Sequence, residues 1–149
     1  MERLVERCAA IKAAIVTADE KENDIRRILN FGHTIGHGLE TAANYRGILH
    51  GEAVGYGMIA AARIASRLKK LTETDRVRIE DAVHSIGRLP KLTNIRVDAV
   101  LAALQHDKKV RDGSVHFILP VAIGRVEITS EVPLDIVSDV VKGILDEAH

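Results

Sequence analysis

Residues 30–52 read NFGHTIGHGLETAANYRGILHGE and hold three of the seven histidines of this chain. His33 and His37 are four residues apart, a spacing that places both imidazoles on one face of a helix, and Glu40 joins that face three residues later. His50 opens a second apolar run after a short loop. Two successive helices could therefore aim three imidazoles and one or two carboxylates, Glu40 and Glu52, at one point. Such a group suits a divalent metal of the zinc type.

Three glycines, Gly32, Gly36 and Gly38, surround these histidines inside an otherwise helical pattern. Each glycine costs about 1 kcal/mol relative to alanine in a helix interior. A compensating gain is needed, so we predict that another helix, a ligand or a substrate approaches the backbone closely here. The spacing of the histidines taken alone is also compatible with a half-buried polar pair.

The helical pattern extends back to Ile25, before the histidines. In one continuous helix, a single face would carry a cation, an amide and two imidazoles, from Arg26, Asn30, His33 and His37. A face of this kind suits an anionic, hydroxylated ligand, and a solvated polar stripe is the alternative. The crowding of glycines and apolar residues around the row favours the binding surface.

Glu52 follows His50 by two residues. Near the start of a helix its charge could complement the helix dipole. Alternatively, its carboxylate could orient a metal-bound histidine through a hydrogen bond. The sequence leaves both roles open.

Apolar periodicity elsewhere predicts a mainly α fold, a bundle-like domain of five to six helices with one small β-hairpin. Further helices are predicted at residues 2–16, 50–70, 72–86, 94–104 and 134–148, and the strands of the hairpin at 115–119 and 125–129. Aromatic residues make up only 3% of the chain, so an aliphatic, alanine-rich core of closely packed helices is expected. We predict one domain over residues 1–149.

Composition argues against several classes of protein. Lysine plus arginine equals aspartate plus glutamate at 21 each, which leaves no basic footprint for nucleic acid. The single cysteine, Cys8, excludes an internal disulfide and fits a reducing compartment. No apolar run is long enough to span a bilayer, and the acidic N-terminus MERLVER is unlike a signal peptide. We therefore expect a cytoplasmic protein with neither a nucleic-acid nor a membrane partner.

Two segments of the chain resemble the signature of the 3-dehydroquinate synthase family, which acts in the shikimate pathway. They are DEKENDIRRILNFGHTIGHGLE at 19–40 and ILHGEAVGYGM at 48–58. The later HDKK, FILP and AIG fit the same family, and the resemblance runs from about Lys12 to the C-terminus. Only the wider group of sugar-phosphate cyclases shares the central motifs closely.

The resemblance implies a role for each matching residue. It makes His33 and His50 the metal ligands, and Zn2+ or Co2+ the metal. Catalytic or substrate-contacting roles fall on His37, Lys108, Lys109, Arg26 and Asn30, and pocket positions on Lys12 and Glu22. The family's third protein ligand is a glutamate upstream of the segment that begins this chain, so the resemblance withdraws Glu40 from the ligand set. Of the two lysines we favour Lys108.

The activity implied is that of 3-dehydroquinate synthase, with NAD as the second cofactor and a phosphorylated small molecule as substrate. The glycine-rich turn that seats NAD is not found in these residues. The chain is therefore expected to be the C-terminal domain without the NAD-binding domain, as a truncated gene product, a split subunit or an excised piece. It should be inactive alone, need an N-terminal half as partner, and form a homodimer through exposed apolar surface.

Two other functions compete with this interpretation. Another sugar-phosphate cyclase, one that forms an inosose or a valiolone, would use the same scaffold. A non-catalytic helical module could also keep the metal site for stability or for docking a partner.

Overall fold

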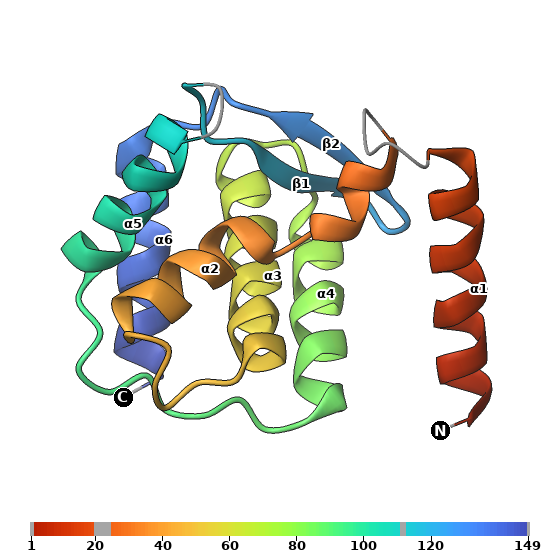
Figure 1. The fold of residues 1–149 in the computed structure, drawn as a ribbon, viewed down its shortest axis with the longest axis horizontal. Helices are drawn as coiled ribbons and strands as arrows, with labels where there is room; N and C mark the ends of the chain where they lie inside the picture. Colours follow the sequence, from red (N-terminus) through yellow and green to blue (C-terminus); the bar gives the residue numbers. More distant parts are fainter. Residues whose placement is uncertain (1, 20–24, 111–112, 149) are drawn as a thin grey trace. The chain divides into compact units, whose positions relative to one another are not determined.

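The computed structural model describes residues 2–19, 25–110 and 113–148. The chain divides into two compact units, Met1–Asn30 and Phe31–His149. The first unit holds helix α1 (Glu2–Ala18) and the short 3-10 helix η1 (Ile25–Asn30), which contact each other (Figure 1). The helix predicted at 2–16 is thus confirmed, whereas one domain over residues 1–149 stays a prediction.

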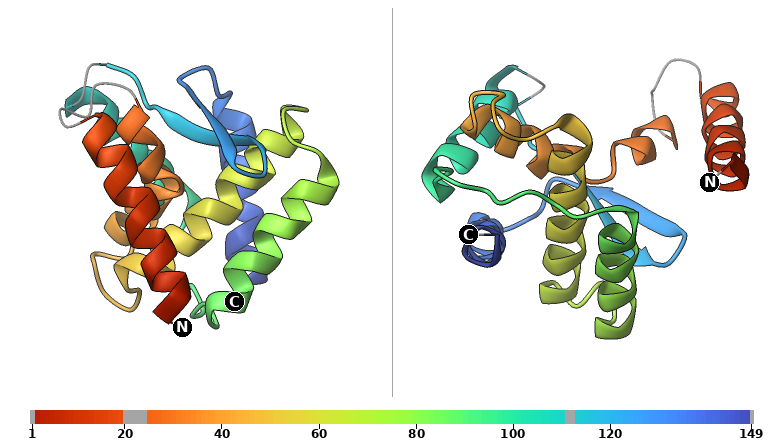
Figure 2. Two further views of the ribbon diagram at one scale, coloured as in Figure 1. Left: turned by 90° about the vertical axis from the view of Figure 1, so that its right-hand side faces the viewer. Right: turned by 90° about the horizontal axis from the view of Figure 1, so that it is seen from below.

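The second unit is a helical assembly with a single antiparallel hairpin among its described residues. Its elements are α2 (His33–Ala42), α3 (His50–Arg67), α4 (Glu73–Ile86), α5 (Val97–Val110), β1 (Phe117–Ala122), β2 (Arg125–Thr129) and α6 (Leu134–Glu147). Helix α3 contacts α2, α4, α6 and β1, and the view from below in Figure 2 places it between α4 and α6. The predicted mainly α fold with one hairpin is confirmed.

Helix α3 is central because its small side chains let its neighbours approach. Two isoleucines of this helix, Ile59 and Ile64, are buried. So are its five alanines, which are Ala53, Ala60, Ala61, Ala62 and Ala65. Burying each isoleucine contributes about 1.5 to 3 kcal/mol. Among the helices that the structure describes, none combines the length and the apolar character needed to cross a membrane.

Helices α2 and α3 meet along three glycines, Gly32, Gly36 and Gly57, which we call the glycine seam. A Cβ on Gly57 would lie 1.8 Å from the carbonyl oxygen of Gly32, and one on Gly32 would lie 2.7 Å from that of Val54. A Cβ on Gly36 would stand 3.1 Å from the carbonyl oxygen of Ala53. The predicted close approach is therefore confirmed, and the element that approaches α2 here is another helix.

The predicted continuous helix from Ile25 through the histidines is wrong. Helix η1 ends at Asn30 and α2 begins at His33, and between them Gly32 adopts a left-handed φ of 84°. A left-handed residue interrupts a right-handed helix, so one helix cannot continue through this glycine. The predicted row from Arg26 to His37 is therefore not one helical face.

Helix α5 is longer than predicted. The sequence placed its end at Leu104, but the helix continues through Gln105 and His106 to Val110. The extension contains neither glycine nor proline, and its residues are compatible with a helix interior. What was expected to be a charged loop is thus the last turn of a helix.

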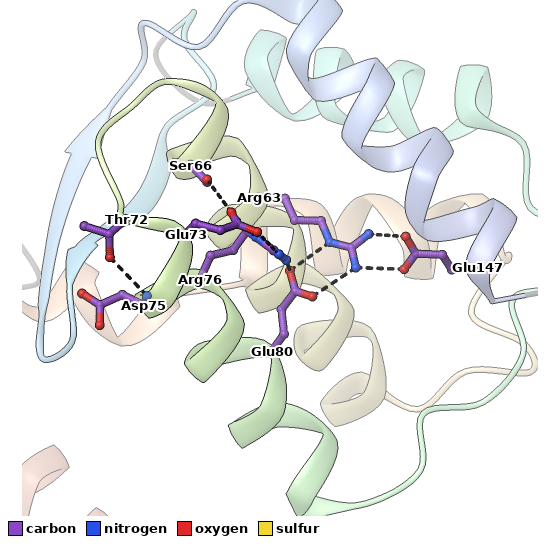
Figure 3. Close-up of polar contacts among 8 residues, drawn as sticks. All are labelled: Arg63, Ser66, Thr72, Glu73, Asp75, Arg76, Glu80 and Glu147. Carbon is purple, nitrogen blue, oxygen red and sulfur yellow. Dashed lines mark hydrogen bonds and ion pairs between the residues drawn. The ribbon is translucent and has the colours of Figure 1, made fainter.

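A cluster of ion pairs joins α3, α4 and α6 (Figure 3). The Arg63 guanidinium on α3 donates to Glu80 on α4 at 3.0 Å and to both oxygens of Glu147 on α6 at 2.8 Å. Arg76 also donates to Glu80. Hydrogen bonding to Glu147 is the largest cause that raises the pKa of Arg63. Burial alone would raise the pKa of Glu80, but hydrogen bonds from both arginines hold it below its usual value.

Helix α4 begins with a side-chain cap. The Thr72 hydroxyl oxygen accepts a hydrogen bond from the backbone N–H of Asp75 at 3.2 Å. This bond satisfies one of the four N–H groups that have no partner at the start of a helix. The cap therefore fixes the point at which the chain turns from α3 into α4.

Candidate functional site

The three histidines of residues 30–52 lie together in the folded chain. His33 is the first residue of α2, His37 follows one turn later, and His50 is the first residue of α3. Their ring centroids are 5.5 Å apart for His33 and His37, 5.4 Å for His33 and His50, and 5.7 Å for His37 and His50. The glycine seam holds the two helices close enough for these contacts.

These separations fit imidazoles that share one metal ion. A zinc–nitrogen bond is about 2.1 Å long, and the ring centroid lies about 1.1 Å further away, so two rings at a tetrahedral angle have centroids about 5.2 Å apart. Each of the three pairs is within about half an ångström of that distance. The centroid distances are thus compatible with a metal shared by two of the rings.

The His50 ring is held by the carboxylate of Glu40. Both oxygens of Glu40 lie 3.2 Å from His50 Nδ1. The Glu40 side chain is only 11% exposed, whereas the His50 side chain is 56% exposed. Because an ionised carboxylate can only accept, Nδ1 carries the hydrogen, and in the neutral ring Nε2 then carries the lone pair.

A similar contact involves His33. Its Nδ1 lies 3.4 Å from the carbonyl oxygen of Phe31, which also can only accept. His37 differs, because it contacts the rings of His33 and His50 but makes no hydrogen bond to any residue in the described part of the chain. Metal-binding histidines almost always donate their other N–H to a carbonyl or a carboxylate. His33 and His50 match this pattern.

A second ligand set is also within reach. One atom each from His37, Glu40 and His50 lie within 4.8 Å of one another. This set contains Glu40, which the spacing of the sequence first brought into the cluster. It shares only His50 with the pair that the resemblance implies.

The carboxylate of Glu52 lies at the start of α3 and caps it. Its Oε2 accepts a hydrogen bond from the backbone N–H of Leu49 at 2.8 Å. Of the two roles that the sequence left open, the one at the helix N-terminus is therefore observed. The carboxylate that contacts His50 is instead Glu40, on the preceding helix.

The other predicted site residues belong to the first unit or have no described side chain. Lys12 is exposed on α1, and Arg26 and Asn30 are partly buried in η1, all three within the first unit. Glu22 lies outside the described residues, and for Lys108 and Lys109 the structure describes only the backbone, at the end of α5. Within the second unit, the structure thus brings together the three histidines and Glu40.

Comparison with known proteins gives the same family as the motifs. A family model described as 3-dehydroquinate synthase C-terminal matches residues 1–110. The 3-dehydroquinate synthase of Solibacter usitatus is 40% identical over 145 residues, which are 97% of this chain and 41% of that protein. That of Nostoc punctiforme is 42% identical over 145 residues, 97% of this chain and 40% of that protein. The chain spans about two fifths of the length of these relatives.

Solved structures of related cyclases share the fold. A 2-deoxy-scyllo-inosose synthase in complex with carbaglucose-6-phosphate, NAD+ and Co2+ matches with a TM-score of 0.79 and 30% identity, over 97% of this chain and 40% of that one. The 2-epi-5-epi-valiolone synthase of Streptomyces hygroscopicus, with NAD+ and Zn2+ bound, matches with a TM-score of 0.78 and 27% identity, over the same shares of the two chains. The family model covers well over half of the chain, and the chain therefore belongs to the 3-dehydroquinate synthase C-terminal family.

Proposed function

We propose that this chain supplies the metal-binding and substrate-binding part of a 3-dehydroquinate synthase. This enzyme of the shikimate pathway converts 3-deoxy-arabino-heptulosonate 7-phosphate into 3-dehydroquinate with elimination of phosphate. The observation that carries the proposal is the pairing of His33 with His50, 5.4 Å apart, each with Nδ1 beside an acceptor. The curated relatives that match nearly all of the chain support the same activity.

His33 and His50 are the proposed metal ligands, each through Nε2, and zinc or cobalt is the proposed metal. When bound, such an ion polarises a hydroxyl or carbonyl oxygen of the substrate. A carboxylate from an N-terminal part of the enzyme, or water, completes the coordination. His37 has no hydrogen-bond partner among the described residues, so its ring nitrogens remain available to accept and return a proton.

Substrate recognition is proposed for cations and polar groups elsewhere in the chain. The guanidinium of Arg26 suits bidentate pairing with a phosphate or carboxylate, and the amide of Asn30 suits hydroxyl groups. One of Lys108 and Lys109, with Lys108 favoured, holds the phosphate end. Lys12 and Glu22 are proposed pocket residues by their match to the family motif.

A separate N-terminal half is proposed to supply the residues of the NAD-dependent step. The relatives are about two and a half times as long as the matched segment, which supports a separate NAD-binding half. Hydride transfer needs a nicotinamide held next to the reacting carbon, so the chain alone should not turn over. A homodimer and a cytoplasmic location are further parts of this proposal.

Metal binding and phosphate release together test the proposed function. Zinc affinity of the metal-stripped chain should fall at least tenfold in His33→Ala and in His50→Ala, and stay unchanged in His84→Ala, which removes an exposed histidine of α4. Phosphate release from the heptulosonate phosphate, with NAD and zinc, should appear only when the N-terminal half is added. Steady turnover by the chain alone would contradict the proposal.

A second candidate is a cyclase with a different sugar phosphate as substrate. The likeness to an inosose synthase and a valiolone synthase favours it. Offering the reconstituted enzyme a hexose phosphate and the heptulosonate phosphate side by side separates the two, because only the true substrate should release phosphate. Metal binding with no turnover on either, despite a folded N-terminal half, would instead favour the non-catalytic helical module.

A further inference from the structure

We propose that Glu40 is a positioning residue, which holds the hydrogen of His50 on Nδ1 and thereby makes Nε2 the metal-binding nitrogen. The inference rests on the proposed metal site at His33 and His50. It assigns the carboxylate a role through the imidazole and not through direct contact with the metal.

The burial of Glu40 is the first observation. Glu40 is 8% exposed, and it is the only charged residue that is buried among the residues that the structure describes. A carboxylate removed from water needs a hydrogen-bond donor, because an unpaired buried charge is strongly unfavourable. The side-chain partner that the fold provides is the Nδ1–H of His50, ten residues later on the next helix.

The arrangement of the two helices keeps this pair in place. Glu40 lies in the last turns of α2 and His50 begins α3, so their separation depends on how the two helices pack. The glycine seam sets that packing through backbone contact, in which Gly57 faces the carbonyl of Gly32. Backbone atoms cannot rotate away as a side chain can, and the Glu40–His50 contact is therefore held by a stiff support.

The distances argue against Glu40 as a direct ligand of a metal on Nε2. Both of its oxygens lie 3.2 Å from Nδ1, so the carboxylate faces that side of the ring. A zinc–carboxylate bond is only about 2.0 to 2.2 Å long. An ion on Nε2, across the ring from Nδ1, is therefore out of reach of Glu40.

Magnetic resonance of the metal-free chain tests the tautomer directly. In protein labelled with nitrogen-15 at histidine, His50 should carry its hydrogen on Nδ1, and in Glu40→Gln the two tautomers should become mixed. Glu52→Gln is the matched control, because it removes the same charge near His50 but caps α3 without touching the ring. It should leave the tautomer of His50 unchanged. A wild-type His50 with its hydrogen on Nε2 would overturn the inference.

Zinc titration gives a second readout. Glu40→Gln should weaken zinc binding by about 10- to 100-fold, as loss of a carboxylate behind a metal-bound histidine typically does. Glu52→Gln should change it by less than about threefold, and equal losses in the two variants would refute the inference. In the zinc-loaded wild type the metal should sit on Nε2 of His50. Metal on Nδ1, together with a Glu40 oxygen, would instead identify the set of His37, Glu40 and His50 as the ligands.

A double-mutant cycle shows whether Glu40 acts through His50. In the His50→Ala background, Glu40→Gln should no longer weaken zinc binding, because the ring that it orients is gone. A loss as large as in the wild type would contradict the inference. If His33→Ala and His50→Ala both leave zinc affinity unchanged, the proposed metal site fails, whereas the tautomer of the metal-free ring still decides the role of Glu40.

Discussion

Replacing Gly57 with alanine should separate the two helices that carry the histidines. A Cβ at this position would lie 1.8 Å from the Gly32 carbonyl oxygen and 2.9 Å from the Gly36 backbone nitrogen. Real Cβ atoms essentially never approach closer than 3.0 Å, so the backbone of α2 must move by about 1.2 Å or more. Both atoms belong to the backbone, which leaves no side chain to absorb the clash.

The net cost follows from two opposing terms. Overpacking of a close contact typically costs about 1 to 3 kcal/mol, and a backbone-to-backbone clash falls at the upper end. Alanine recovers about 1 kcal/mol because it favours the helix more than glycine does. We therefore expect Gly57→Ala to lower the free energy of unfolding by about 2 kcal/mol. For a chain of this size that corresponds to a melting temperature lower by roughly 4 to 8 °C.

Thermal denaturation followed by circular dichroism measures this effect, and zinc titration measures its consequence for the site. Gly143→Ala on α6 is the control, because a Cβ there meets nothing within 4 Å and should stabilise the helix by about 0.5 to 1 kcal/mol. Zinc binding should weaken in Gly57→Ala only, because His33 on α2 and His50 on α3 move apart when the two helices separate. A Gly57→Ala variant as stable as Gly143→Ala, with unchanged zinc affinity, would refute the reasoning.

Three further changes test other parts of the chain. Thr72→Ala removes the cap of α4 and should cost about 1 kcal/mol in thermal denaturation, and an unchanged melting temperature would show that the cap contributes nothing. The pKa of the Glu80 carboxyl lies below its usual value of 4.5. Its pairing with Arg63 therefore stabilises the fold at pH values above 4.5, and this stabilisation is lost as the pH falls through the lowered pKa. Glu80→Gln should therefore lower the melting temperature at pH 7 but not in strong acid. An equal decrease of the melting temperature at both pH values would contradict this. Lys108→Ala should slow phosphate release by the reconstituted enzyme more than Lys109→Ala, and the reverse order would assign the phosphate contact to Lys109.

Local rules predicted most of the helices, because their signals lie within a few neighbouring residues. The apolar periodicity of α3 and the turn residues around the hairpin each act over one element. The break at Gly32 was missed because the glycine looked tolerable inside a helical pattern, and its cause is the backbone of α3, more than twenty residues away. The end of α5 was missed for a related reason, since a charged run such as HDKK is compatible with both a helix and a loop.

The candidate site was predicted in part. Helical spacing brought His33, His37 and Glu40 to one face, and His50 after a loop completed the group of rings observed here. The partner of His50 could not be read from spacing, because two carboxylates stood near it in the sequence. Only the packing of α2 against α3 decides that Glu40 lies beside the ring.

The turn that connects α2 to α3 contributes little to the positions of the histidines. Its residues Asn44, Tyr45 and Gly47 adopt positive φ angles, and a Cβ on Gly47 would meet nothing within 4 Å. Tyr45 is 72% exposed. Because the glycine seam fixes the spacing of the two helices, evolution or an engineer can lengthen the turn between Tyr45 and Gly47 without moving the histidines. A reporter peptide or an affinity handle can therefore be inserted at this turn, three to five residues before His50, one of the two proposed metal ligands.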